Sequence, residues 1–323
     1  MYRVLVVADP LDDLNIAMDS TLRIVQEMLE RDSIFEVFYC DYAKLNVEAA
    51  NFLDALPASR VLHCDVNDAN FFGLDVRRTV RAEDFDAILL RQDPPVDARF
   101  ARCCERFAPI ANKVLFVNDP RWIAALKEHI LPTEYPDFSI PTTVCHSFEE
   151  LISAVRAQRP EAVVKPENES SGIGIVFVDP QTPAEGLREH YSKYGPTVIV
   201  QPYLDEITKS GDLRVLFMNG QVLGSVLRVP QKGSRLANFF QGGTGAKQDP
   251  SPRQIEIAQS VGRDLMKKGI YFVGFDFIGD LLSEVNITSP TGMAQINALN
   301  GVRTEKDFND QLLRLLDKRD ESR

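Results

Sequence analysis

The sequence lacks several features that would assign it to a function class at once. Its five cysteines include no C-x-x-C pair, and its four histidines are scattered without the spacing of metal ligands. An odd number of scattered cysteines is typical of buried thiols in a reducing compartment, not of a disulfide framework. No apolar run is long enough to span a membrane, and the first apolar run is too short for the core of a signal peptide. We therefore expect a cytoplasmic protein without a membrane partner.

Positive charge is scarce as well. The 36 Lys and Arg residues are outnumbered by 47 Asp and Glu residues, which gives a net charge of -11. No basic stripe offsets this charge, which argues against a nucleic-acid partner and leaves small molecules as the expected ligands. What remains is an ordinary globular composition, 44% hydrophobic and 26% charged, on a chain of 323 residues. That length suffices for two or three packed units.

The first third of the chain alternates apolar runs with helical periodicity. Apolar positions from Leu22 to Leu29 recur at helical spacing after the possible cap Asp19. Residues 42–82 show no readable pattern. Strand–helix–strand alternation predicts a doubly wound parallel sheet over residues 1–120. The predicted strands are 3–8, 35–40, 87–91 and 113–118.

Polar residues follow two of these strands at the edge where open α/β sheets bind ligands. Asp19 and Ser20 come after the first strand, and Arg91 with Asp93 ends a later one. We interpret Asp19, Ser20 and Arg91 as substrate contacts. Helix capping by Asp19 and Ser20, and an Arg91–Asp93 pair that only stabilises the loop, would explain the same residues.

A small-residue loop follows the strand 162–166, which ends near Lys165. The loop contains Ser170, Ser171, Gly172 and Gly174, and an apolar strand resumes after it. Backbone amides and hydroxyls of such a loop can donate to phosphate oxygens, with Lys165 as a neighbouring charge. The ending G-K-[ST] is absent and no helix follows, so this is not a P-loop. An ordinary hairpin loop is the alternative.

Polar residues also interrupt the apolar strands farther along the chain. The apolar segment 197–204 begins as a strand and runs into Gln201-Pro202, where backbone groups can bond the edge of an adenine. Asp212, Arg214 and Arg228 lie in two strands joined by the turn Asn219-Gly220. Buried arginines need anionic partners, which are either the local acids or an anionic substrate.

Residues 230–250 form a long segment with little periodicity. A loop of this length within a compact domain is usually functional or mobile, and we expect it to act as a lid. Arg235 and Asn238, followed by Gly242 and Gly243, suit the close approach of an anionic ligand. An amphipathic helix, 252–268, comes next.

The most informative stretch is an apolar hairpin that contains Asp276, Glu284 and Asn286. Carboxylates in an apolar setting require a cation, and oxygen ligands suit a hard one such as Mg²⁺. Glu284 and Asn286 share one face of their strand. Asp276 faces Glu284 only if the connecting loop has an odd number of residues, and we predict Gly279 to Leu281 with a bulge. An edge hairpin with solvated acids is the alternative.

Taken together, these motifs resemble those of an ATP-grasp ligase, and within that superfamily those of bacterial glutathione synthetase. The resemblance runs essentially from end to end. Its most specific pieces are Arg91-x-Asp-Pro-Pro95, Gly211-Asp-x-Arg214, Arg235-x-x-Asn-x-x-x-Gly-Gly243 and Phe272-Val-Gly-x-Asp276, which leads to Glu284-x-Asn-x-Thr-Ser-Pro-Thr291. Ala17-Met18 and Ala294-Gln295 stand where the family commonly has a lysine and an Arg-Glu pair.

The resemblance implies an α/β (α+β) fold in which a pre-ATP-grasp domain, 1–120, precedes an ATP-grasp domain, 121–323. The latter would divide into a lid subdomain at about 130–200 and a metal and ligase subdomain at about 201–323. ATP and two Mg²⁺ ions, with Mn²⁺ as a substitute, are the implied cofactors, and a homo-oligomer is the implied assembly. The implied metal ligands are Asp276, Glu284 and Asn286. The implied ATP contacts are Lys127, Lys165, Ser170, Ser171, Gly172, Gly174, Gln201, Tyr203, Leu204 and Asp212.

The implied reaction is ATP-dependent formation of glutathione from γ-glutamylcysteine and glycine through an acyl phosphate. The implied catalytic residues are Arg228, Arg235 and Asn238. The implied substrate contacts are Asp19, Ser20, Arg91, Arg214, Gly242, Gly243, Ser289 and Thr291. Two alternatives stay open: a related ligase that joins another acid and amine, and a nucleotide-binding regulator without catalysis.

Overall fold

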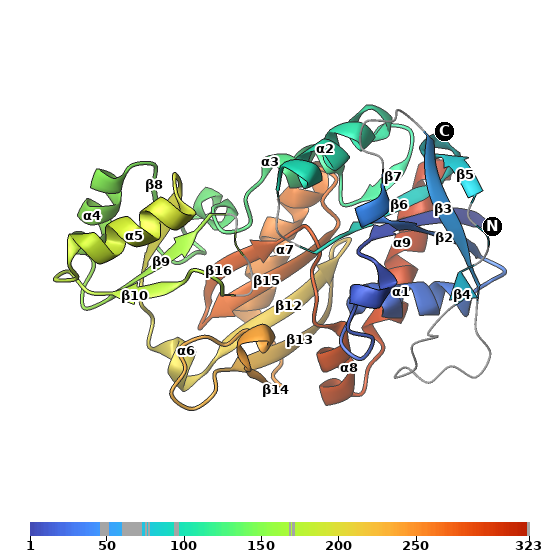
Figure 1. Ribbon diagram of the computed structural model, residues 1–323. Helices are drawn as coiled ribbons and strands as arrows, with labels where there is room; N and C mark the ends of the chain where they lie inside the picture. The colour runs from blue at the N-terminus through green and yellow to red at the C-terminus, as the bar shows by residue number, and fades with distance from the viewer. Residues whose placement is uncertain are drawn as a thin grey trace.

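Three β-sheets follow one another along an elongated molecule (Figure 1). The computed structural model describes residues 1–45, 52–59, 73–74, 76, 78–93, 97–167, 169 and 172–321. The amino-terminal sheet lies at one end, a small four-stranded sheet at the other, and a five-stranded sheet between them. The protein therefore has the mixed α/β fold that the sequence predicts.

The amino-terminal sheet has the order β4-β3-β2-β1-β6-β7, with β5 paired to β3. Its central strands β2, β1, β6 and β7 are parallel. Side chains alternate between faces, so that Val4 and Val6 pack with helices α1 and α9, whereas Leu5 and Val7 pack with α2. Helices on both faces make it doubly wound, as predicted. The elements are β1 (Tyr2–Ala8), α1 (Ser20–Leu29), β2 (Phe35–Asp41), β3 (Phe52–Ser59), β4 (Gly73–Leu74), β5 (Arg78–Arg81), β6 (Ala87–Arg91), α2 (Ala98–Phe107), β7 (Leu115–Val117) and α3 (Pro120–Ala125).

The unreadable stretch 42–82 was expected to be irregular, and that expectation is wrong where the structure describes it. Strand β3 adds to the edge of β2 in the antiparallel direction, and β4 and β5 pair with β3. The outer strands β4 and β5 have only two and four residues, and β5 is mostly exposed, so they leave no continuous apolar run in the sequence.

The small sheet is antiparallel, in the order β10-β9-β11-β8, and two helices cover one of its faces. Leu151 and Val155 of one helix and Leu187 of the other pack against Val164 and Val198 of the strands. The elements are β8 (Thr143–Cys145), α4 (Phe148–Ala157), β9 (Ala162–Pro166), β10 (Val176–Val178), α5 (Ala184–Tyr194) and β11 (Val198–Pro202). This compact unit is well placed to cover the neighbouring five-stranded sheet.

The middle sheet is antiparallel as well, in the order β14-β13-β12-β15-β16. The turn between β12 and β13 has positive φ at Asn219 (48°) and Gly220 (90°), as a two-residue hairpin requires. Sequence patterns predicted α7 well but gave no sign of α8 or β14. The elements are α6 (Glu206–Lys209), β12 (Asp212–Met218), β13 (Gln221–Val229), β14 (Thr244–Ala246), α7 (Pro252–Lys267), β15 (Phe272–Ile278), β16 (Leu281–Asn286), α8 (Met293–Asn300) and α9 (Thr304–Glu321).

The β15–β16 hairpin confirms one prediction and corrects another. Asp276 pairs directly with Glu284, so their side chains lie on one face, as predicted. The loop, however, consists of two residues, Gly279 and Asp280, because Ile278 pairs with Leu281. Ser283 is an extra residue that forms a β-bulge. The bulge brings Asp276 and Glu284 to the same face, as a loop with an odd number of residues would have done.

One buried amide joins the middle sheet to the amino-terminal sheet. Asn118, just after β7, donates to the carbonyl oxygens of Phe272 and Ile287 at 2.7 and 2.6 Å. Its oxygen accepts the backbone N–H groups of Tyr271 and Phe272, each at 2.8 Å. All four bonding positions of the amide are used, which fixes the start of β15 and the end of β16 against the first sheet.

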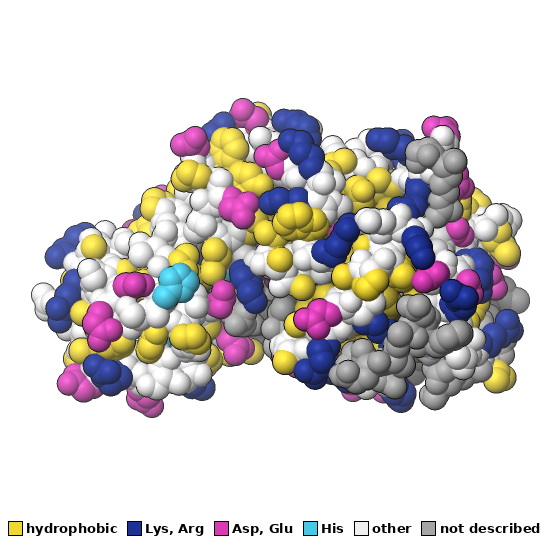
Figure 2. Space-filling view, turned by 90° about the horizontal axis from the view of Figure 1, so that it is seen from above, with side chains coloured by type: hydrophobic (Ala, Val, Ile, Leu, Met, Phe, Trp, Pro, Cys, Tyr) yellow, Lys and Arg dark blue, Asp and Glu magenta, His cyan; other side chains and the backbone are white. Residues whose placement is uncertain are grey.

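Among the described residues, neither the cysteines nor the surface charges indicate a disulfide framework or a charged binding surface. Cys40, Cys103, Cys104 and Cys145 are all buried, and burial raises the pKa of Cys103 to about 12. On the face shown in Figure 2, basic and acidic side chains are interspersed along the whole molecule. In the described part of the chain, no helix has the length and apolar character needed to cross a membrane.

Candidate active site

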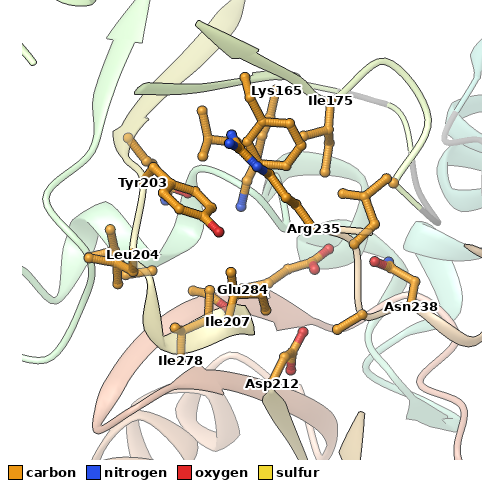
Figure 3. Close-up of a pocket in the computed structure, with 18 of the residues that line it drawn as sticks. Lys165, Ile175, Tyr203, Leu204, Ile207, Asp212, Arg235, Asn238, Ile278 and Glu284 are labelled. Carbon is orange, nitrogen blue, oxygen red and sulfur yellow. The ribbon is translucent and has the colours of Figure 1, made fainter. Parts of the chain in front are cut away.

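A cavity lies between the small sheet and the middle sheet (Figure 3). It spans about 740 Å³, part of which is open to solvent. Figure 3 shows Lys165 of β9 entering from one side and Glu284 of β16 with Asp212 of β12 from the other. The two sheets therefore bring an ammonium group and two carboxylates to one space.

Asp276 is the most heavily bonded acid beside this cavity. Arg214 contacts both of its oxygens, Oδ1 through Nε and Oδ2 through Nη2 at 2.7 Å. Arg228 approaches Oδ2 to 2.8 Å and Asn286 donates to the same oxygen at 3.2 Å. Burial alone would raise the pKa of Asp276, but the two guanidinium groups outweigh it and lower the pKa to about 2. Local acids thus supply the anionic partners of Arg214 and Arg228, which was one of the two predicted outcomes, while Arg228 Nε has no partner.

Asp212 is the second acid of this network. Its Oδ2 accepts a hydrogen bond of 2.5 Å from Arg228, whereas its Oδ1 is buried and has no partner. Burial raises the pKa of Asp212 to about 6; Arg228 opposes the shift and Asp276 adds to it. Of the two acids that share Arg228, Asp276 therefore holds its negative charge more firmly.

The predicted metal ligands Glu284 and Asn286 each have a side-chain oxygen that could bind a hard cation. Glu284 is 20% exposed and lines the cavity. Asn286 directs its amide nitrogen to Gly274 and Asp276, which turns its oxygen the other way. In the described ranges, no group of three or more His, Cys, Asp or Glu is arranged to hold a metal alone. A cation here would need Asn286 and ligand oxygens as well, as is usual for Mg²⁺ bound with nucleotide phosphates.

Lys165 is the clearest predicted phosphate contact. Burial lowers the pKa of its ammonium group, and the carboxylates of Glu284, Asp212 and Asp276 oppose the shift. Gly172 lines the same cavity with φ of 80°. Gly174 does not line it; its carbonyl oxygen lies 2.6 Å from His190 Nε2. Ser170 and Ser171, also predicted as phosphate contacts, lie outside the described residues.

The other end of the cavity is mainly apolar. Gln201, Tyr203 and Leu204 all line it, as the predicted base contacts should, together with several apolar side chains. The side-chain amide of Gln201 donates to Thr142 Oγ1 at 2.9 Å, and its backbone pairs with Val163 of β9. The apolar residues include Ile175, Phe177, Ile207 and Ile278.

Arg235 and Asn238 of the long segment 230–250 line the cavity, whereas Gly242 and Gly243 are needed for the backbone conformation of the loop. Arg235 bonds Glu161 at 2.7 Å, and its guanidinium carbon lies 5.1 and 5.0 Å from the ring centres of Phe177 and Tyr203. Gly242 takes φ of 82°. At Gly243 a Cβ atom would stand 2.0 Å from the Ala237 carbonyl oxygen, so only glycine fits. Neither glycine lines the cavity.

The sequence patterns predicted that Lys127 would line the cavity, but it does not. His129, which no pattern singled out, lines the cavity instead. The adjacent Glu128 accepts the backbone N–H groups of Ile287 and Thr288 at 2.6 and 2.7 Å, which docks this segment onto the end of β16. Burial, reinforced by Glu284, raises the pKa of Glu128. No spacing signal marks His129 in the sequence, because its role depends on this docking.

The predicted substrate contacts gather at the carboxyl edge of the amino-terminal sheet. Arg91 is buried; it donates to Thr21 Oγ1 at 3.1 Å and to the Pro290 carbonyl at 3.0 Å, while Nη1 has no partner. Burial lowers the pKa of Arg91, and Asp19, Asp93 and Asp9 oppose the shift. A buried donor without a partner is costly, which suits a site completed by an anionic ligand.

The remaining predicted substrate residues surround this arginine. Asp19 caps α1 through Leu22 N at 2.8 Å, and Ser20 accepts from Met293 N at 3.3 Å, so the predicted capping role holds for Asp19. Ser289 donates to the Arg91 carbonyl at 3.3 Å. Arg214 donates to the Thr291 carbonyl at 3.2 Å and thereby joins this region to Asp276.

The two stretches that differ from the family pattern touch each other. Gln295 Nε2 lies 3.7 Å from the sulfur of Met18, one residue before Asp19. An uncharged pair thus stands beside the substrate region, where the resemblance implied charged side chains.

Family models match nearly the whole chain. The prokaryotic glutathione synthetase N-terminal domain matches residues 2–124, and the ATP-grasp domain of the same family matches residues 128–301. The glutathione synthetase of Brucella melitensis biotype 1 is 30% identical over 314 residues, which cover 95% of this chain and 97% of that protein. That of Nitrosomonas europaea is 31% identical over 300 residues, which cover 91% and 92%.

Solved structures share the fold at low sequence identity. D-cycloserine synthetase DcsG superposes with a TM-score of 0.66 at 17% identity, covering 97% of this chain and 99% of that one. The D-alanine-D-alanine ligase from Coxiella burnetii gives a TM-score of 0.58 at 11% identity, covering 99% and 95%. At these identities the likeness shows the fold alone.

Proposed function

The chain belongs to the prokaryotic glutathione synthetase family, and we propose that it forms glutathione, ADP and phosphate from γ-glutamylcysteine, glycine and ATP. The observation that carries this proposal is the cavity between the two antiparallel sheets. Its apolar end suits a nucleotide base, and its other end gathers Lys165, Asp212 and Glu284. A carboxylate-rich end beside a buried lysine suits a phosphate chain with its cation.

ATP would lie with its base among Tyr203, Leu204 and Ile207 and its phosphates toward Lys165. Gly172 and Asn238 flank the same space. Lys127, Ser170, Ser171 and Gly174 remain proposed phosphate contacts from the family resemblance. In support, the charged groups that act on the buried Lys165 are the carboxylates of Glu284, Asp212 and Asp276. The same ammonium group could also donate hydrogen bonds to phosphate oxygens.

Divalent cations, two Mg²⁺ ions by family resemblance, would be held by Glu284, Asn286 and Asp276. Asp276 Oδ1 carries one of the four hydrogen bonds made to this carboxylate and Oδ2 the other three, so Oδ1 is the better candidate ligand atom. Bound cations would offset the negative charge of the phosphates. Arg214 and Arg228 keep Asp276 ionised for this purpose, as its low pKa indicates.

The acid substrate would bind at Arg91, with its reactive carboxylate toward the γ-phosphate. The unpartnered Nη1 of Arg91 can donate to a substrate carboxylate, and the acids around it suit a substrate ammonium group. A carboxylate oxygen would attack the γ-phosphorus and ADP would leave. The neutral amine of glycine would then attack the acyl carbon, phosphate would leave with that oxygen, and the amine would lose a proton.

Arg235 and Asn238 remain proposed contacts of the reacting groups. Arg235 now pairs with Glu161, and it would have to exchange that partner for a phosphoryl oxygen to take the proposed role. We also propose the division of the chain at residue 120, the cytoplasmic location and a homo-oligomeric state; size measurement in solution tests the last.

A panel of acid and amine pairs tests the proposed substrates. We expect phosphate release with ATP, Mg²⁺, γ-glutamylcysteine and glycine together, and much less when either acid or amine is omitted. The product is identified by mass. Turnover only with other acids would reject glutathione synthesis, and the uncharged Met18–Gln295 pair would then be the first specificity element to exchange. Tight ATP binding without turnover of any pair would instead favour a regulator.

A further inference from the structure

We propose that His129 supplies a nitrogen ligand to the divalent cation held at Glu284 and Asn286. The inference rests on the metal site proposed above and adds a residue that none of the sequence motifs contains. His129 stands in the segment that Glu128 docks onto the end of β16, and its ring lines the nucleotide cavity. Its side chain is 12% exposed, so water supplies little of its bonding.

The contacts of the ring fix which nitrogen is available. Nε2 lies 2.7 Å from the carbonyl oxygen of Glu169. A carbonyl oxygen only accepts hydrogen bonds, so Nε2 must carry a proton. In the neutral ring Nδ1 is then left with its lone pair. A hydrogen bond from the second ring nitrogen to a backbone carbonyl is the usual way in which a metal-binding histidine is oriented.

The free nitrogen points at the proposed metal carboxylate. Nδ1 is buried, has no hydrogen-bond partner, and lies 3.5 Å from Glu284 Oε1. Two donor atoms that share a cation at roughly 2.1 Å, in neighbouring positions, are roughly 3 Å apart. A small side-chain adjustment therefore lets one cation bind both atoms, which satisfies the orphaned nitrogen and the carboxylate together.

A second histidine shows that the carbonyl contact alone does not make a metal ligand. His190 Nε2 lies 2.6 Å from the Gly174 carbonyl, and its Nδ1 is likewise buried without a partner. Its ring, however, packs against Tyr194 at 5.0 Å between centres. Among the described histidines, only His129 has a ring nitrogen within 4.0 Å of a carboxylate oxygen.

A nitrogen ligand changes which metals the site prefers. Imidazole favours transition metals, whereas Mg²⁺ favours oxygen ligands. We therefore expect the site to bind Mn²⁺ more tightly than an all-oxygen site would, with a smaller effect on Mg²⁺. This preference is a property of binding, so it can be measured without turnover.

Pulsed electron paramagnetic resonance of bound Mn²⁺ tests the proposal on the full chain with a non-hydrolysable ATP analogue. Protein labelled with ¹⁵N only in histidine is compared with unlabelled protein, which distinguishes imidazole from the amine of Lys165. We expect a nitrogen coupling that changes with the label, is lost in His129→Gln and persists in His146→Gln, where the histidine is exposed. Mn²⁺ affinity should fall at least about tenfold in His129→Gln, and Mg²⁺ affinity less than about threefold.

A coupling that is absent from the wild type, or that survives in His129→Gln, would overturn the proposal and leave a simple His129–Glu284 contact. The wild-type comparison needs no variant, so it decides the matter even if His129→Gln fails to fold. Ligation by a wild type that shows no histidine coupling would refute this inference alone. Absence of ligation in the substrate panel would refute the proposed function instead.

Discussion

Glu284→Gln is expected to lower the ligation rate at least about a hundredfold while the fold is retained. Loss of groups that merely support metal ligands costs about 10–100-fold, so loss of a ligand carboxylate should cost at least the upper figure. Glu284 is also the acid that most opposes the loss of charge from buried Lys165. Without it, Lys165 would hold its proton less firmly and bind phosphate more weakly. Steady-state phosphate release at saturating ATP measures the effect.

The control for this change is Glu256→Gln on α7. Glu256 is exposed and pairs only with Arg253 on its own helix among the contacts seen here, at 2.8 Å. It should leave both the rate and the thermal midpoint close to the wild-type values. Near-normal ligation by Glu284→Gln, with a normal circular dichroism spectrum, would show that Glu284 is not a metal ligand.

Asp276→Asn is expected to destabilise the ligand-free protein by about 3–5 kcal/mol. The carboxylate is 1% exposed and bonded to two buried guanidinium groups. The amide that replaces it carries no charge, so Arg214 would be left buried without its ion-pair partner. Arg228 would keep Asp212, which is why the loss should stay within this range. Urea unfolding measures the change in free energy.

The pH dependence of stability should change in the same variant. The pKa of Asp276 is about 2 in the folded protein, below its ordinary value of 3.8. An acid with a lowered folded pKa stabilises the fold above its unfolded pKa and loses this contribution as the pH falls through the folded value. The wild type should therefore lose stability relative to Asp276→Asn between about pH 4 and pH 2.

A double variant separates charge imbalance from lost packing. Arg214→Gln with Asp276→Asn removes both members of the ion pair and should recover part of the stability that Asp276→Asn loses. If Asp276→Asn alone costs less than about 1 kcal/mol, the two arginines do not depend on this carboxylate.

The sequence was a good guide wherever one segment determines its own structure. The strand 87–91 and the Asn219–Gly220 turn lie where their patterns predict. Asp276 faces Glu284 because the register of a hairpin follows from its two strands. A bulge was predicted in the loop, but its position at Ser283 could not be foreseen, since a longer loop would place Asp276 and Glu284 on one face equally well.

Features that depend on distant segments were harder to predict. Buried arginines could be assigned either to local acids or to a substrate until β12, β13 and β15 were seen side by side. Arg235 reaches Glu161, which is 74 residues away in the chain. His129 enters the cavity only because Glu128 bonds backbone groups about 160 residues later. Such placements arise from tertiary packing and leave no local periodicity.

The most direct test of the account follows one oxygen atom. With γ-glutamylcysteine labelled by ¹⁸O in its cysteinyl carboxylate, ligation through an acyl phosphate transfers one labelled oxygen to each phosphate released. Mass spectrometry of the phosphate, with glycine and Mg²⁺ present, should find this label in step with the formation of glutathione. Unlabelled phosphate would mean that water, not the substrate carboxylate, attacks ATP, and would contradict the proposed ligase reaction.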